Sequence, residues 1–372
     1  MKWLLQLLLF IPIIFTSFYS NAEANSPTME NKLGEMLDNK YQLNTEAQLD
    51  NNYSPEINEF WDKHAQVYSF ESTNGGTIHT IHITTGQKNA VVISQGRNES
   101  VLKYKEFAFD LSKQGYDVFL IDHRGQGFSS RLGGDAHRGH VEDFQHYVID
   151  LKTFIDSLQL DKHYQYRFLL SHSMGGTINA LYLEEQSHPF QAAAFFSPMF
   201  SINLGGLPAF IAKIISYISD LLCRWFSDLA CYAPGVGPYK ATSFEKNELT
   251  NSTKRYASAF HFFEVAKETQ LGGATMRWVN QSLYATEKAI DSASLIKIPV
   301  IIIQSGADSI VTAEGQQAFL ENSAQCAASK LVTIAGAKHE LLLEQDIYRI
   351  PAITAVLDFF QQYQKGKLAC IK

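Results

Sequence analysis

Residues 166–176 read YRFLLSHSMGG, in which a short apolar run passes directly into a serine flanked by small residues. The apolar run is typical of a buried strand, and a helical pattern follows over Met174–Gln186. A strand, a sharp turn and a helix form a nucleophile elbow, which holds a serine hydroxyl above the sheet. The turn needs small residues two places before and after the serine, and Ser171 (where glycine is usual) and Gly175 stand there. The stretch therefore predicts Ser173 as a nucleophile.

Two later loops supply the partners that such a serine needs. A serine hydroxyl requires a base to take its proton, and with this elbow the acid and then the histidine follow along the chain. Asp308 follows the apolar strand expected over 299–304, and His339 follows a strand that ends at Ile334. Since the carboxyl ends of parallel strands meet at one edge of a sheet, both side chains are expected beside Ser173. We therefore predict a triad of Ser173, Asp308 and His339.

Two backbone amides are expected to stabilise the oxyanion of a tetrahedral intermediate. One belongs to Met174, directly after the nucleophile at a helix N-terminus. The other belongs to Arg97, in the loop after the strand at 90–94. Gly96 beside it is predicted to contact substrate, with strand termination as the alternative role.

Strand-like and helical segments alternate around this stretch. Apolar strands that alternate with helices predict a mostly parallel central sheet covered by helices on both faces, an α/β fold. The alternation stops after Pro198 and resumes near residue 299, so we expect core segments 61–198 and 293–366 with a helical cap over 199–292. The expected strands are 66–71, 77–84, 90–94, 116–122, 166–170, 191–197, 299–304 and 330–334, and the expected core helices are 99–114, 141–160, 174–186, 313–324 and 350–364.

The N-terminus has the pattern of a targeting segment. Residues 1–24 carry a positive charge at Lys2, continue as an apolar run and end in Ala22-Glu23-Ala24, a small-x-small cleavage pattern. An uncleaved anchor is the alternative, because the run approaches the about 17 residues of a short membrane span. Both interpretations predict an exported protein, periplasmic or secreted, and leave membrane association open. Residues 25–60 are polar and asparagine-rich, which indicates an irregular lead-in.

The composition of the chain excludes some classes of partner. The 372 residues are 45% hydrophobic with a net charge of −7 and no basic block, so nucleic acid is not expected as a partner. The glycine-containing loop at 122–129 lacks the dinucleotide-binding pattern, and no His-Glu-x-x-His motif occurs, so we expect no cofactor and no metal.

Four cysteines accompany the export pattern, an even number as disulfide-bonded proteins usually have. They allow three pairings, among which proximity in the chain favours Cys223 with Cys231 and Cys326 with Cys370. Free thiols remain the alternative.

Several short motifs lie along the core and the cap. They are GRNES (96–100), DHRGQG (122–127), GHV (139–141), HSMGG (172–176), LGGAT (271–275), RWV (277–279) and GAKHE (336–340). Together they resemble the bacterial lysophospholipases of the monoacylglycerol-lipase branch of the α/β-hydrolase superfamily, over roughly residues 60–362. The resemblance implies ester hydrolysis on a single-chain lipid, either a lysophospholipid or a monoacylglycerol. The export pattern departs from that family.

The cap contains an apolar segment that suits a lipid substrate. Residues 204–225 are apolar on most faces of a helix, and Phe196 leads into the cap. We predict that Phe196, Leu207, Phe210 and Ile214 line an acyl-chain site, and that the cap or the N-terminal segment contacts a membrane surface. An ordinary buried cap helix is the alternative.

Two other functions remain open at this stage. A proline-iminopeptidase-like serine aminopeptidase would need carboxylates to hold a free amine, and the cap offers Glu245, Glu248 and Glu264 among several lysines. A non-catalytic binding protein with a hydrolase fold is the other alternative. It would have no reason to keep three triad residues, which argues against it.

Overall fold

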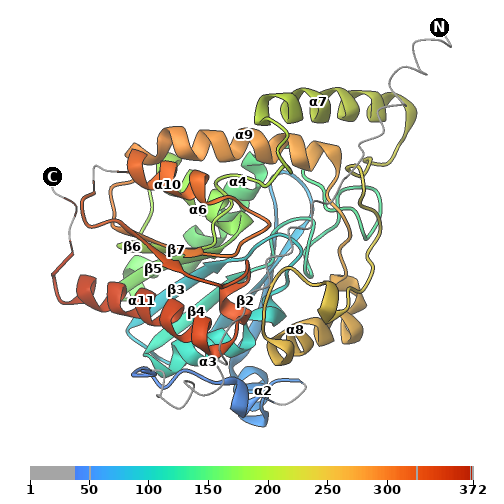
Figure 1. Ribbon diagram of the computed structural model, residues 1–372. Helices are drawn as coiled ribbons and strands as arrows, with labels where there is room; N and C mark the ends of the chain where they lie inside the picture. Colours follow the sequence, from blue (N-terminus) through green and yellow to red (C-terminus); the bar gives the residue numbers. More distant parts are fainter. Residues whose placement is uncertain (1–37, 50–51, 324–325, 369, 371–372) are drawn as a thin grey trace, which may run out of the picture. The chain divides into compact units, whose positions relative to one another are not determined.

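One mixed sheet of eight strands organises the chain from Asn39 onward in the computed structural model (Figure 1). The structure describes residues 38–49, 52–323, 326–368 and 370, so the predicted signal peptide lies outside the described residues. In spatial order the strands are β1 (Ala65–Glu71), β2 (Thr77–Ile83), β4 (Tyr116–Ile121), β3 (Asn89–Ser94), β5 (Tyr166–His172), β6 (Ala192–Phe196), β7 (Val300–Ser305) and β8 (Lys330–Ile334). β1 and β2 form an antiparallel hairpin, β2 pairs antiparallel with β4, and all pairs from β4 to β8 are parallel.

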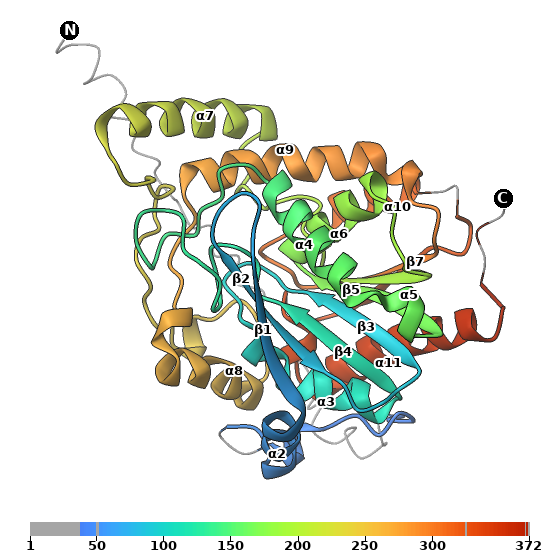
Figure 2. The same cartoon turned by 180° about the vertical axis from the view of Figure 1, so that it is seen from behind.

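Helices cover both faces of this sheet, as Figures 1 and 2 show from opposite sides. Neighbouring residues of a strand point to opposite faces, so Phe168 and Leu169 of β5 belong to different layers. Leu169 joins the core under α4 (Gln145–Leu158), α6 (Met174–Glu185), α9 (Met276–Ser292) and α10 (Ala313–Asn322). Phe168 stacks on Phe360 of α11 (Asp346–Gln364), with ring centroids 4.1 Å apart, on the face that also carries α3 (Lys105–Lys113). The predicted α/β fold is confirmed.

Some helix boundaries differ from those expected, for local reasons. The helix expected at 99–114 begins as a 3-10 turn, η3 (Val101–Tyr104), because the side chain of Ser100 accepts a bond from Leu102 N and caps it. The helix expected at 141–160 begins later, at the start of α4, where the side chain of Asp143 accepts a bond of 2.9 Å from Gln145 N. α5 (Leu160–His163) follows it as a separate turn.

The N-terminal lead-in is more ordered than its composition suggested. α2 (Pro55–His64) runs across the boundary expected at residue 60, because Ser54 caps it and Pro55 stands at its first position, where proline suits a helix. Before it, η2 (Glu46–Gln48) follows Asn44, whose buried side chain donates a bond to Glu106 of α3. The lead-in after Asp38 is therefore part of the core packing.

The insertion between β6 and β7 is helical, and within the described residues it contains isolated bridges but no strand. Its elements are α7 (Ala209–Phe226), η4 (Phe244–Lys246), α8 (Thr253–Val265), η5 (Lys267–Thr269), α9 and η6 (Ala293–Leu295). α9 packs on α6 of the core, and α7 packs on α9 (Figure 2). No helix in the described part of the chain is long and apolar enough to cross a membrane.

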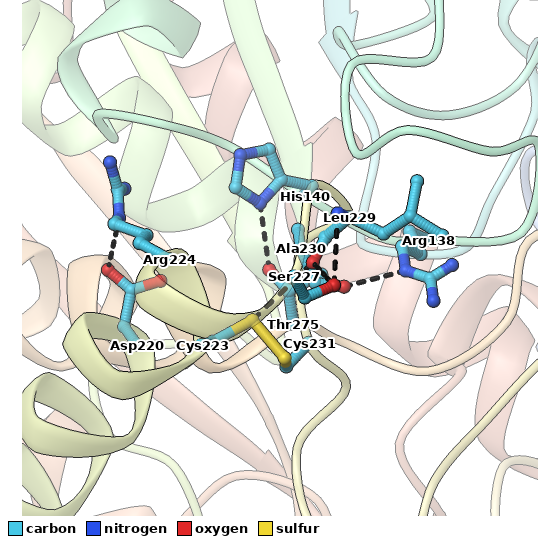
Figure 3. The surroundings of a disulfide bond; sticks show 10 residues. All are labelled: Arg138, His140, Asp220, Cys223, Arg224, Ser227, Leu229, Ala230, Cys231 and Thr275. Atoms are coloured by element: carbon cyan, nitrogen blue, oxygen red, sulfur yellow. Dashed lines mark hydrogen bonds and ion pairs between the residues drawn. A yellow bond between two sulfur atoms is a disulfide. The ribbon is translucent and has the colours of Figure 1, made fainter.

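Both favoured cysteine pairs are disulfide-bonded. Cys223, in the last turn of α7, is bonded to Cys231, and Cys326 is bonded to Cys370. Figure 3 shows the first bridge beside Thr275, at the start of α9. The carbonyl of Cys231 accepts a bond of 2.9 Å from the amide of Met276, so this disulfide fastens the end of α7 to the start of α9.

Candidate active site

Ser173 stands on a strained turn between β5 and α6. Its φ of 50° and ψ of −119° are unusual for a residue with a side chain, which is the strain expected of a nucleophile elbow. A Cβ on Gly175 would lie 2.1 Å from the carbonyl oxygen of Ser94, so only glycine fits there. A Cβ on Gly176 would lie 2.5 Å from Pro198. The structure therefore has the predicted elbow geometry, in which the turn at Ser173 lies close to the backbone of Ser94 and to Pro198.

The structure brings the three predicted triad residues into one hydrogen-bonded chain. Ser173 Oγ lies 2.9 Å from His339 Nε2, and His339 Nδ1 lies 2.8 Å from Asp308 Oδ2. The other oxygen of Asp308 accepts bonds from the amides of Ile310 at 2.8 Å and Val311 at 3.1 Å. Burial opposes ionisation of Asp308, but these bonds and His339 outweigh it and lower its pKa. Asp308 is therefore held as a carboxylate in a fixed orientation.

The two amides predicted as oxyanion donors are both available. Neither the amide of Met174 nor that of Arg97 donates to another group within the described residues. Gly96 lies behind the nucleophile, since a Cβ on it would stand 3.0 Å from Ser173 Cβ. Its amide donates to Glu99 Oε2 at 3.0 Å, so Gly96 supports the loop and does not line the cavity.

A cavity of about 310 Å³ opens beside Ser173 and His339. Most of its wall is aliphatic and aromatic, formed by Met199, Ile202, Leu249, Ala259, Phe260, Phe262, Phe263, Trp278, Ile310 and Val311. One part of the wall is polar and is formed by Arg97, Asn98, Glu99, Lys103 and Glu340. A cavity with a large apolar wall and a smaller polar wall suits a ligand that has an apolar chain and a polar end.

Four residues predicted to contact substrate lie elsewhere. Phe196 is fully buried in β6, where its ring packs on Phe107 of α3, and it does not line the cavity. Leu207, Phe210 and Ile214 lie on the outer surface at or before α7, with exposed fractions of 41%, 65% and 54%. The described cavity is lined from the cap by α8 and α9 instead, because α7 packs on α9 with its small residues inward.

Sequence reasoning missed a cluster of four charged side chains next to the triad, which we name the Glu99 cluster: Glu99, Lys103, His172 and Glu340. Glu99 Oε1 lies 2.7 Å from His172 Nδ1 and 2.8 Å from Lys103 Nζ, which also lies 2.5 Å from Glu340 Oε1. His172 Nε2 lies 3.2 Å from the carbonyl oxygen of His339. A signal was present, since two members are chain neighbours of Ser173 and His339 and the other two have i,i+4 spacing.

The charges of this cluster stabilise one another. Burial opposes protonation of His172, but Glu340 and Glu99 outweigh it and raise its pKa to about 9. Burial likewise opposes ionisation of Glu99, yet Lys103 and His172 hold its pKa well below its ordinary value. Burial also opposes the charge of Lys103, but the two carboxylates raise its pKa. Two positive and two negative charges therefore balance within the cluster.

The same cluster contains the donor atoms of a conceivable metal site. Atoms of Glu99, His172 and Glu340 lie within 4.8 Å of one another. Lys103, however, bonds to both carboxylates, and its ammonium group occupies the electrostatic role that a cation would have. The donor set is therefore better described as an ion-pair network than as a metal centre.

A largely parallel sheet with a serine elbow and a Ser–His–Asp chain at its carboxyl edge defines the α/β-hydrolase class. The chain belongs to the Hydrolase_4 family, described as serine aminopeptidase, S33, whose profile matches residues 85–346.

Relatives within this class act on lipid esters. The chain is 36% identical to lysophospholipase L2 of Escherichia coli K12 over 277 residues, which are 73% of this chain and 80% of that protein. It is 32% identical to a probable lysophospholipase L2 of Haemophilus influenzae over 283 residues, 76% of this chain and 86% of that protein. It is 26% identical to human monoglyceride lipase over 245 residues, 64% and 71% of the two chains.

Solved structures share the fold. A soluble variant of monoglyceride lipase from Saccharomyces cerevisiae matches with a TM-score of 0.61 at 19% identity, over 81% of this chain and 96% of that one. With the sequence relatives, this makes the chain a serine hydrolase that acts on esters, and the interpretation as a binding protein without catalysis is set aside.

Proposed function

We propose that this enzyme hydrolyses single-chain lipid esters, a lysophospholipid or a monoacylglycerol, through an acyl-enzyme on Ser173. His339 removes the proton of Ser173 Oγ as the hydroxyl attacks the ester carbonyl, and Asp308 orients the imidazole and stabilises its charged form. The amides of Met174 and Arg97 stabilise the oxyanion. The imidazolium of His339 then donates this proton to the departing alcohol, the glycerol end of the lipid, as the tetrahedral intermediate collapses to the acyl-enzyme. The neutral imidazole next removes a proton from the water that attacks the acyl-enzyme, and the fatty acid and free Ser173 are released.

The observation that carries this proposal is the hydrogen-bonded chain Ser173–His339–Asp308 at the wall of the cavity. The nucleophile and the base lie within hydrogen-bond distance, and the base is oriented by a third group, as acyl transfer to serine requires. The apolar wall of the cavity accommodates a hydrocarbon chain beside the nucleophile, which supports a lipid ester over a small polar one.

The family description favours a second candidate, an aminopeptidase. That reaction would need an unpaired carboxylate at the cavity to bind the substrate's amine. Glu99 and Glu340 do line the cavity, but Lys103 and His172 already neutralise them. The cap residues considered for this role, Glu245, Glu248 and Glu264, are exposed and do not line the cavity. The described site therefore supports the lipid ester better.

We further propose that α7 rests on a lipid surface. Its outward face exposes large apolar side chains: Phe210, Ile214, Ile215, Tyr217, Ile218, Leu221, Leu222, Trp225 and Phe226. Its inward face carries Ala212, Ser216, Asp220 and Cys223. A helix with an apolar outer face of this kind is typical of interfacial membrane contact.

Export, proposed from residues 1–24, is consistent with two disulfides, which form in oxidising compartments.

The decisive experiment is fatty-acid release from 1-palmitoyl-lysophosphatidylcholine and 1-monopalmitoylglycerol by the purified enzyme. A Ser173→Ala variant is the matched control, because the change removes one oxygen and keeps the fold. Release from either lipid by the wild type, reduced by about 10³-fold or more in the variant, is the expected result.

Two outcomes would contradict the proposal. Lipid hydrolysis that persists in Ser173→Ala would exclude the acyl-enzyme on this serine. Hydrolysis of short-chain esters without hydrolysis of either lipid would keep the serine hydrolase and exclude the lipid substrate; turnover of proline-aminoacyl reporters would then favour the aminopeptidase.

A further inference from the structure

The side chain of Arg97 lies in the wall of the cavity, in a niche formed by the core and the cap. Its Nη2 donates to the carbonyl oxygen of Gly272 at 2.8 Å, and its Cζ lies 5.1 Å from the ring centroid of Trp278. A Cβ on Gly139 would stand 2.3 Å from Nη2, so glycine at this position makes room for the guanidinium. The guanidinium is thus held in one place by residues from three separate segments.

This guanidinium has no counter-ion among the residues that the structure describes. No carboxylate lies within ion-pair distance of it, its Nε is buried without an acceptor, and its Nη1 donates to no described group. Burial of a charge without a partner is costly, and burial lowers the pKa of Arg97 to about 10. The carbonyl of Gly272 and the ring of Trp278 offset part of this cost, and an anionic ligand in the cavity would supply the counter-charge that is missing.

The other charged groups of the cavity wall do not need such a ligand. Lys103 is paired with Glu99 and Glu340, and His172 beneath them supplies the second positive charge. Since these four charges balance, the carboxylates do not leave a net negative field that would repel an anion. Arg97 is the unbalanced charge among the described lining residues.

We propose that the Arg97 side chain binds the phosphodiester group of a lysophospholipid whose acyl ester lies at Ser173. Arginine suits this role because its planar fork of N–H groups matches the oxygens of a phosphate. In a lysophospholipid only the short glycerol unit separates the ester from the phosphate, and Arg97 follows Gly96, which contacts the elbow at Ser173. Arg97 thus makes the enzyme prefer lysophospholipids over uncharged monoacylglycerols, an inference that rests on the proposed function.

The experiment compares kcat/KM for 1-palmitoyl-lysophosphatidylcholine and for 1-monopalmitoylglycerol in the same detergent micelles. Arg97→Met removes the charge and keeps the backbone amide, and Arg97→Lys keeps a charge without the fork. Arg277→Met is the matched control, because that guanidinium lies nearby on α9 but bonds to the carbonyl of Glu142 and does not line the cavity.

The readout is the ratio of the two kcat/KM values. Any displacement of the Arg97 amide lowers kcat/KM for both substrates alike, so its effect cancels in the ratio. We expect Arg97→Met to lower the ratio of phospholipid to glyceride about 10- to 100-fold, the effect of losing a hydrogen-bonded charge pair. Arg97→Lys should lower it less, and Arg277→Met should leave it as in the wild type.

Equal losses on both lipids in Arg97→Met would show that the side chain only supports the fold and would overturn the inference. An Arg97→Met variant that loses activity on neither lipid would overturn it as well. In both cases the proposed function would stand, provided that Ser173→Ala abolishes hydrolysis. A wild type that hydrolyses neither lipid would overturn the inference and the proposed function together.

Discussion

The pH dependence of folding stability tests the charge of His172 directly. Its Nδ1 faces a carboxylate oxygen of Glu99, and its Nε2 faces the carbonyl oxygen of His339. Because Glu99 is ionised, both neighbours accept hydrogen bonds and neither donates one, so both ring nitrogens carry hydrogen. His172 is therefore an imidazolium in the folded protein at neutral pH, beneath the nucleophile turn.

The size and the sign of the effect follow from the pKa. A rise from the ordinary 6.5 to about 9 corresponds to about 3 kcal/mol, at about 1.36 kcal/mol for each pH unit. No reduction for solvent screening applies, since 1% of the side chain is exposed. The folded state holds a proton that the unfolded state releases above pH 6.5. The stabilisation is thus fully present below pH 6.5 and is lost as the pH rises through about 9.

The assay is the free energy of unfolding from urea titrations of the wild type and of His172→Gln, measured from pH 6.5 to above 9. The difference between the two proteins should shrink by about 3 kcal/mol over this range, because all other groups titrate in both. His163→Gln, at the exposed end of α5, is the control and should show no such change. A difference between wild type and His172→Gln that stays constant with pH would refute a charged His172.

Two further predictions concern the disulfides and α7. Replacing the two cysteines of one disulfide with serine should lower the free energy of unfolding by about 4 kcal/mol for Cys326–Cys370 and by about 2.5 kcal/mol for Cys223–Cys231. The first loss is larger because that disulfide closes the longer loop, with a sequence separation of 44 against 8. The reverse order of the two losses in urea titrations would contradict this. Trp225→Ser should weaken co-sedimentation of the enzyme with phospholipid vesicles about tenfold. The control is Val67→Ser on β1, which should not weaken it, although Val67 is 67% exposed and Trp225 is 71% exposed. Equal losses in the two variants would contradict α7 as the contact.

The fold and the Ser–His–Asp chain were predictable because their signals are local and ordered. An apolar strand that runs into a serine with small neighbours has few other structural solutions, and loops after parallel strands must meet at one edge. Asp308 and His339 could therefore be placed near Ser173 from their order alone. The same reasoning found the strand alternation, because each buried strand is a continuous apolar run bounded by turn residues.

Side-chain directions were not predictable in this way. Arg97 entered the sequence argument through its amide, and only the structure places its guanidinium beside Trp278 and away from the carboxylates of the described residues. The Glu99 cluster joins residues that are up to 241 positions apart in the chain, so its ion pairs depend on the assembled sheet. A sequence pattern shows which charged residues stand next to the triad in the chain, but it does not show which of their charges form ion pairs in the fold.

The orientation of α7 shows why an apolar pattern alone misplaces a binding residue. Phe210 and Ile214 were expected at an acyl-chain site because residues 204–225 are apolar on most faces of a helix, whereas a surface helix usually turns its apolar stripe toward the core. Here small and polar residues face α9, where Asn280 donates to Lys213 O at 3.1 Å and to Ser216 Oγ at 3.0 Å. The disulfide of Cys223 fixes the end of the helix as well. These bonds hold the inner face against α9 and leave the apolar face exposed, which is the observation on which the proposed contact with a lipid surface rests.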